Sequence, residues 1–191
     1  MSERRISFDT RKMTYLAMLT AIVMVLQYFG SFIKLGAQFS VTLVLVPVVM
    51  GAALCGVLSA GWLGLVFGAC VLMYGDAAAF LVVNPLGTVA TVLLKGALAG
   101  LAAGLVYKLI EKFNKYLAIM VAAIICPIVN TGVFIIGSYL FFIPTITEWA
   151  GGGDAGVYII TVLVGANFLF ELLFNILLAP SILRVLNLKK Q

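Results

Sequence analysis

The chain has 191 residues, of which 64% are hydrophobic and only 10% are charged, and its mean hydropathy is +1.21. Soluble domains carry about 25% charged residues, so this composition excludes a soluble globular protein and predicts an all-α integral membrane protein. A spanning helix needs about 20 apolar residues, which leaves room for roughly six spans and for no separate enzyme domain. The net charge of +5 is not a signal for nucleic-acid binding, because basic residues in a membrane protein report its orientation.

Six apolar stretches, separated by polar or glycine-rich connections, are predicted to cross the membrane as a compact bundle of helices. A basic segment, residues 1–12, precedes a transmembrane domain over residues 13–184, and a basic tail, residues 185–191, follows it. In chain order, the predicted spans are Met13–Phe32, Val41–Leu58, Ala60–Tyr74, Leu86–Tyr107, Leu117–Phe141 and Val157–Leu183.

The basic residues gather on one side of this predicted arrangement. They lie before the first span, between the fourth and fifth, and after the sixth: Arg4, Arg5, Arg11, Lys12, Lys108, Lys112, Lys115, Arg184, Lys189 and Lys190. The positive-inside rule makes that side cytoplasmic, together with both termini. The longer loops, after the first, third and fifth spans, are then outside, and this outer face is the expected recognition face because binding groups often lie on long loops.

Residue types that support catalysis are scarce. The chain has no histidine, which argues against His-based acid–base catalysis and against the usual zinc sites. Cys55, Cys70 and Cys126 lie inside apolar runs and are interpreted as small buried hydrophobic residues, not as disulfides or metal ligands. We therefore expect no enzyme activity, no metal and no cofactor.

The fourth predicted span carries an ionisable side chain near its middle. Thr88, Thr91 and Lys95 are spaced so that they share one helical face. A lysine inside the bilayer costs about 2.5–3.5 kcal/mol on insertion scales, so a partner or a ligand must compensate it.

Polar residues also mark the fifth and sixth spans. Asn167, Glu171 and Asn175 form a stripe on one face of the sixth, and Asn130 and Phe134 share a face of the fifth. Facing polar stripes predict a pocket that opens outward, with aromatic walls. The expected substrate-binding residues are Asn84, Thr88, Thr91, Lys95, Asn130, Phe134, Trp149, Asn167, Glu171 and Asn175.

Two other interpretations of these polar residues stay open at the level of sequence. Lys95 and Glu171 could form a buried ion pair that joins the fourth and sixth spans, with the asparagines as interhelical hydrogen-bonding groups. The same residues could also line a path for protons or sodium ions.

Small residues recur at every fourth position on two predicted spans. The fourth has Gly96, Gly100 and Gly104, and the third has Ala60, Gly64 and Gly68. Such ridges allow close helix packing in membranes, so we expect a tightly packed seam in the inner half of the fourth span.

With these features in place, the chain resembles the substrate-binding S components of energy-coupling factor (ECF) vitamin transporters. The resemblance rests on six predicted helices, the basic N-terminus, the pair Ala17 and Ala21 in the first span, the Asn84-Pro85 loop and the last helix with its Asn and Glu residues. It implies a multi-pass protein of a prokaryotic cell membrane that captures a water-soluble vitamin in a pocket near the outside, under loops that close over it.

The same resemblance implies partners other than membrane lipid. An S component associates with a transmembrane T subunit and two ATPase subunits, and Ala17 and Ala21 would form the surface that meets the T subunit. The chain has no Walker A pattern, so the partners would hydrolyse the ATP. A stand-alone or oligomeric carrier or channel is the alternative.

For the ligand, Lys95 favours an anion, because a substrate carboxylate compensates a buried ammonium group. We favour pantothenate, and riboflavin, lipoate, folate and cobalamin are the alternatives.

Overall fold

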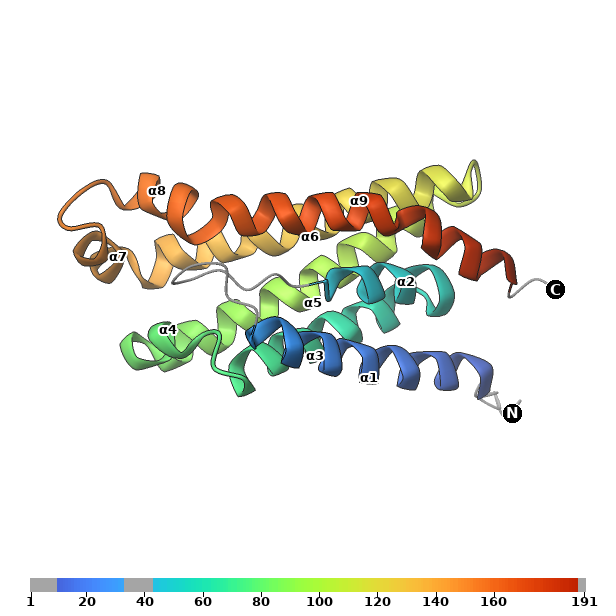
Figure 1. Ribbon diagram of the computed structural model, residues 1–191, viewed down its shortest axis with the longest axis horizontal. Helices are drawn as coiled ribbons and strands as arrows, with labels where there is room; N and C mark the ends of the chain where they lie inside the picture. The colour runs from blue at the N-terminus through green and yellow to red at the C-terminus, as the bar shows by residue number, and fades with distance from the viewer. Residues whose placement is uncertain (1–9, 33–42, 189–191) are drawn as a thin grey trace, which may run out of the picture.

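The computed structural model describes residues 10–32 and 43–188. Most of the basic N-terminal segment, the loop predicted after the first span and the last three residues of the tail lie outside the described residues. Within the described ranges the chain is helical and contains no strand. Its elements (Figure 1) are α1 (Thr10–Phe32), α2 (Leu45–Cys55), α3 (Val57–Met73), α4 (Ala78–Val83), α5 (Pro85–Ile110), α6 (Lys115–Phe141), α7 (Ile143–Trp149), α8 (Ala155–Tyr158), the π-helix η1 (Ile159–Val164) and α9 (Gly165–Leu188).

Four helical segments of the described chain are long and apolar enough to cross a membrane: Thr10–Ser31, Pro85–Ile110, Lys115–Phe141 and Ala155–Asn187. The second and third predicted spans are shorter, with 11 residues in α2 and 17 in α3. At a rise of 1.5 Å per residue these helices are about 16 and 25 Å long, less than a hydrocarbon core of about 30 Å. Four of the six predicted spans are therefore confirmed as helices long and apolar enough to cross a membrane, and crossing by α2 and α3 stays a prediction.

Gly56 explains why the second predicted span ends early. Its φ of 99° lies in the left-handed region that favours glycine, and it separates α2 from α3. The Gly56 N–H donates to the carbonyl groups of Gly51 and Ala52, which completes the last turn of α2. The chain therefore turns at Gly56, shortly before the predicted end of the second span at Leu58.

The ends of the long helices follow from local sequence. The Asn84 side chain caps α5 by accepting a hydrogen bond of 2.9 Å from the Gly87 N–H, and Pro85 supplies the fixed φ of the first helical position. Asn114 caps α6 by accepting from the Leu117 N–H at 3.1 Å.

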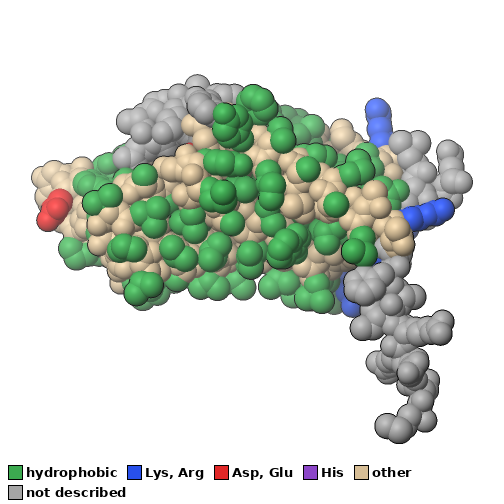
Figure 2. Space-filling view, turned by 90° about the horizontal axis from the view of Figure 1, so that it is seen from below, with side chains coloured by type: hydrophobic (Ala, Val, Ile, Leu, Met, Phe, Trp, Pro, Cys, Tyr) green, Lys and Arg blue, Asp and Glu red, His purple; other side chains and the backbone are tan. Residues whose placement is uncertain are grey.

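The two ends of the bundle differ in charge. Both termini lie at one end together with the α2–α3 and α5–α6 turns, whereas α4, α7 and α8 lie at the other (Figure 1). On the face shown in Figure 2, Lys and Arg side chains appear only at the end with the termini, and an acidic side chain appears at the opposite end. A broad band of hydrophobic side chains lies between them. This arrangement agrees with the charge asymmetry of the sequence. That the basic end faces the cytoplasm stays a prediction.

The predicted loops after the third and fifth spans are partly helical. They contain the short helices α4 and α7 and the start of α8, and the sixth predicted span runs from the end of α8 through η1 into α9. A π-helical turn is rare and often lies at a functional site.

The seam expected from the glycine pattern joins α3 to α5. A Cβ atom on Gly64 would overlap the carbonyl oxygen of Gly96, and one on Gly96 would overlap that of Gly64. One on Gly100 would overlap the carbonyl oxygen of Ala60. The two backbones therefore touch directly, as small-residue ridges in membrane helices permit, and this contact fixes α5 relative to α3.

Candidate functional site

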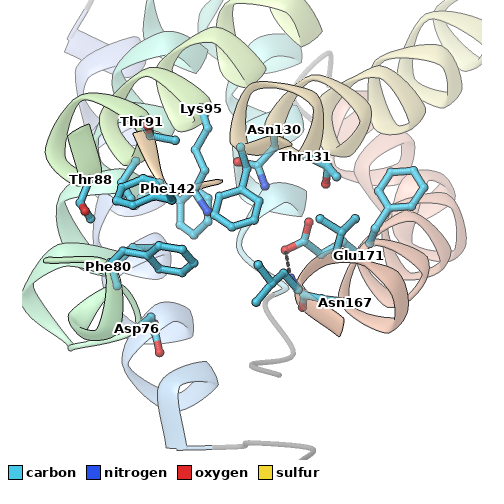
Figure 3. A pocket seen from close by; sticks show the side chains of 18 of the residues that line it. Asp76, Phe80, Thr88, Thr91, Lys95, Asn130, Thr131, Phe142, Asn167 and Glu171 are labelled. Carbon is cyan, nitrogen blue, oxygen red and sulfur yellow. Dashed lines mark hydrogen bonds between the residues drawn. The ribbon is translucent and has the colours of Figure 1, made fainter. Parts of the chain in front are cut away.

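A cavity of about 140 Å³ lies among the helices of the bundle. Side chains from α1, α3, α4, α5, α6, η1 and α9 line it, so the contributing residues come from nearly the whole described chain. Figure 3 shows Lys95 reaching into the cavity from α5 while Glu171 points toward it from α9 on the opposite side.

Seven of the ten residues predicted to bind substrate line this cavity: Thr88, Thr91, Lys95, Asn130, Phe134, Asn167 and Glu171. Their convergence follows from helical periodicity, because the threonines and lysine share one face of α5 and the asparagine and glutamate share one face of α9.

The other three predicted residues have different places. Asn84 caps α5 with its side chain, and its backbone carbonyl oxygen accepts a hydrogen bond from Thr88 Oγ1 at 2.8 Å. The Asn175 side chain donates from Nδ2 to the backbone oxygen of Glu171 at 2.8 Å. Trp149 packs on Phe80, with ring centroids 5.3 Å apart. None of the three is among the residues that line the cavity.

Lys95 is flanked by aromatic rings and shares the cavity with two carboxylates. Its Nζ atom lies 5.4 Å from the ring centroid of Phe134 and 5.7 Å from that of Phe67, distances at which a cation and a ring face attract. Glu171 and Asp76 line the same cavity as Lys95. The cavity thus holds one cationic side chain and two carboxylates among its described lining residues.

Several polar atoms of the lining have no hydrogen-bond partner among the described residues. They include Thr91 Oγ1, Asn130 Oδ1 and Asn167 Oδ1, each with less than 1 Å² of exposed surface. Because an unpaired buried polar group costs free energy, such atoms normally bind water or a ligand. In this cavity they provide hydrogen-bonding positions for a polar molecule.

An aromatic cluster covers the end of the cavity that lies toward α4 and α7. The Phe80 ring of α4 meets Phe134, Phe142 and Trp149 edge to face, at centroid distances of 5.8, 5.0 and 5.3 Å. Phe80 therefore links α4, in the predicted loop after the third span, to Phe142 and Trp149, in the predicted loop after the fifth span. Such pairs contribute about 0.5–1.5 kcal/mol each beyond their buried area.

Sequence reasoning missed several residues of this site, among them Gln27, Asp76, Phe80 and Phe142. Gln27 had a usable signal, because it is an amide inside an otherwise apolar predicted span. Asp76 follows the third predicted span, and a carboxylate in a loop carries no signal that it lines a cavity. The two phenylalanines carry no sequence signal that separates them from the many other aromatic residues of the chain.

The chemistry of the lining suits reversible recognition of a small polar molecule, since it combines charged groups, amides and aromatic walls. Residues 11–183 match the family model described as the ECF transporter, substrate-specific component. The chain belongs to this family. Comparisons with curated proteins and with solved structures gave no match.

Membership of the ECF substrate-specific components confirms the resemblance noted from sequence and makes the chain a membrane transport component. The family is one of transporter subunits and not of enzymes, and the apolar helices of the structure agree with a membrane location.

Proposed function

We propose that this S component captures a small water-soluble vitamin from outside a prokaryotic cell, in the cavity that contains Lys95, and delivers it inward when its partners hydrolyse ATP. The observation that carries the proposal is the combination of a lysine with unpartnered, buried polar atoms in one cavity. An apolar packing core has no need of such groups, whereas a ligand with an acidic group and several polar groups satisfies them.

Pantothenate is the vitamin that we favour. Its single carboxylate matches Lys95, and its polar groups match the amide and hydroxyl groups of Asn130, Asn167 and Thr91. Lipoate shares the carboxylate but offers an apolar ring instead of hydroxyl groups.

Mass spectrometry of small molecules that co-purify with the detergent-solubilised protein tests this function. We expect pantothenate, or another water-soluble vitamin, in near-stoichiometric amount, and we expect calorimetry to detect its binding to the emptied protein. If no vitamin co-purifies and none binds on titration, the proposal is wrong.

We further propose that α1 presents the docking surface for the T subunit. Ala17 and Ala21 are exposed on this helix, next to the exposed Met18 and Ile22, so this side of α1 is free to meet another membrane helix. Small residues on such a surface permit a close approach.

Replacing both Ala17 and Ala21 with leucine is expected to leave vitamin binding within about twofold of wild type and to reduce ATP-dependent uptake at least about tenfold. The added side chains would hold the T subunit away from α1 without reaching the cavity. Uptake into cells that express the partners, and co-purification of those partners, are the measurements.

The control replaces Ala90 and Ala166, exposed alanines on α5 and α9, with leucine. Normal uptake by the α1 variant would refute the docking surface, and uptake without any ATPase would favour the stand-alone carrier.

Phe80→Ala is expected to accelerate ligand release by about one order of magnitude, because it removes the ring that links α4 to Phe142 and Trp149. Stopped-flow displacement of bound vitamin measures this rate. Val82, which is 87% exposed on the same helix, provides the control Val82→Ala. An unchanged release rate in Phe80→Ala would show that the aromatic cluster does not retain the ligand.

A further inference from the structure

A second group of polar side chains joins α1 to the segment after α3. The carboxylate of Asp76 accepts hydrogen bonds at Oδ2 from Gln27 Nε2 at 2.6 Å and from Ser31 Oγ at 2.8 Å. Ser31 has a single hydroxyl proton, which the Asp76 carboxylate shares with the Gln27 backbone carbonyl oxygen, 2.9 Å from Ser31 Oγ. Asp76 is thus held in one position against α1.

The side-chain amide of Gln27 has a fixed orientation. A carboxylate only accepts hydrogen bonds, so Gln27 must present its NH₂ group to Asp76, and its Oε1 atom must point elsewhere. Gln27 is fully buried and lines the cavity. Its Oε1 atom has no hydrogen-bond partner in the described part of the chain. A buried acceptor in this position requires a donor, and the cavity is the space from which a donor can approach.

Gln27 and Asp76 line the cavity from other elements than Lys95, because Gln27 lies on α1 and Asp76 follows α3, whereas Lys95 lies on α5. These groups also differ in chemistry, because Lys95 is a cationic donor whereas Gln27 Oε1 and the Asp76 carboxylate are acceptors.

We propose that Gln27 and Asp76 form a specificity subsite that accepts hydrogen bonds from a hydroxyl or amine group of the same ligand whose acidic group meets Lys95. This inference rests on the proposed function and narrows the substrate class. The substrate is then a compact carboxylate with hydrogen-bond donors on the part of the molecule remote from its acidic group. A carboxylate with an apolar remote end leaves Gln27 Oε1 unpaired and is selected against, since sites built to bind a hydroxyl group reject analogues that lack it.

Calorimetric titration of the purified full chain with three probes tests the subsite. The probes are pantothenate, a pantothenate analogue in which methyl groups replace both hydroxyl groups, and lipoate. We expect the wild type to bind pantothenate at least about tenfold more tightly than the analogue or lipoate, which corresponds to one or two good hydrogen bonds. Gln27→Met removes the acceptor at similar size and should reduce this preference to about twofold or less. Asp76→Asn should also reduce the preference for pantothenate over the other two probes.

Ser31→Ala is the matched control. Ser31 supports Asp76 from α1 but does not line the cavity, so its loss should leave the preference for hydroxyl groups within about twofold of wild type. If Gln27 and Asp76 only tied the loop to α1, all three variants would weaken the three probes equally and the preference would stay constant. That result would overturn the subsite.

Other results separate the subsite from the proposed function. Equal binding of pantothenate and its analogue by the wild type would overturn the subsite and leave the proposed function in place. Failure of all three probes to bind would also overturn the subsite as stated, whereas a different co-purifying vitamin would still support the function. Only the absence of any vitamin, bound or co-purified, would remove both.

Discussion

Lys95→Met is expected to weaken vitamin binding by roughly 10- to 150-fold, equivalent to about 1.5–3 kcal/mol, the usual contribution of a hydrogen bond to a charged group. Methionine keeps an unbranched apolar stem against Phe67 and Phe134, so the walls of the cavity stay filled. The ammonium group that would meet a ligand carboxylate is the main feature removed. Calorimetry on protein freed of its ligand measures the change in affinity.

The matched control is Lys108→Met, on the same helix. Lys108 is exposed and lies near the end of α5, so its replacement should leave the affinity within about twofold of wild type. Thermal unfolding of both variants separates binding from folding, because loss of a buried charged side chain can also change stability. Wild-type affinity in Lys95→Met would favour the alternative in which Lys95 and Glu171 are a structural pair.

The polar residues of the cavity could be predicted because intramembrane polar groups are few and their spacing along a helix is regular. Lys95 and Glu171 are conspicuous in apolar sequence, and the helical repeat places Thr91 and Asn167 beside them. The capping role of Asn84 was harder to predict, since an asparagine before a proline also suits a binding loop. Whether a polar residue serves a helix end or a cavity depends on backbone geometry that sequence spacing does not contain.

Most of the site residues that could not be predicted depend on contacts between residues far apart in the sequence. Gln27 and Asp76 are joined across 49 positions of sequence, and neither residue alone indicates the other. Phe80 becomes central only because the segments after α3 and α6 fold over the same end of the cavity. The early end of α2 at Gly56 and the π-helical turn η1 within the sixth predicted span could not be predicted, because hydropathy reports burial in lipid and not local φ and ψ.

The glycine seam shows a stronger link between sequence and structure, because a repeated small residue has few other uses in a membrane helix. The pattern on α3 and α5 predicted a close contact, and the structure places the backbones of Gly64 and Gly96 against each other. This contact also bears on the site, since Gly96 directly follows Lys95. Expansion of the seam would displace the lysine from Glu171 and Asp76.

Gly96→Ala is therefore expected to destabilise the protein by about 3 kcal/mol or more, at the upper end of overpacking substitutions, because the new Cβ would meet the backbone of Gly64 and no change of rotamer can relieve it. For a domain of this size, that loss corresponds to a fall of roughly 6–12 °C in the midpoint of thermal unfolding. The recovery of monodisperse protein after heating in detergent, measured by size-exclusion chromatography, gives the midpoint.

Gly132→Ala on α6 is the matched control, because a Cβ at that position has no atom within 4 Å. The higher helix propensity of alanine should leave this variant as stable as wild type or more stable by up to about 1 kcal/mol. The opposite response of two identical substitutions isolates the α3–α5 contact from any general effect of glycine loss. If Gly96→Ala unfolded at the same temperature as Gly132→Ala, α3 and α5 would have room to separate, and the seam would not be what holds Lys95 in place.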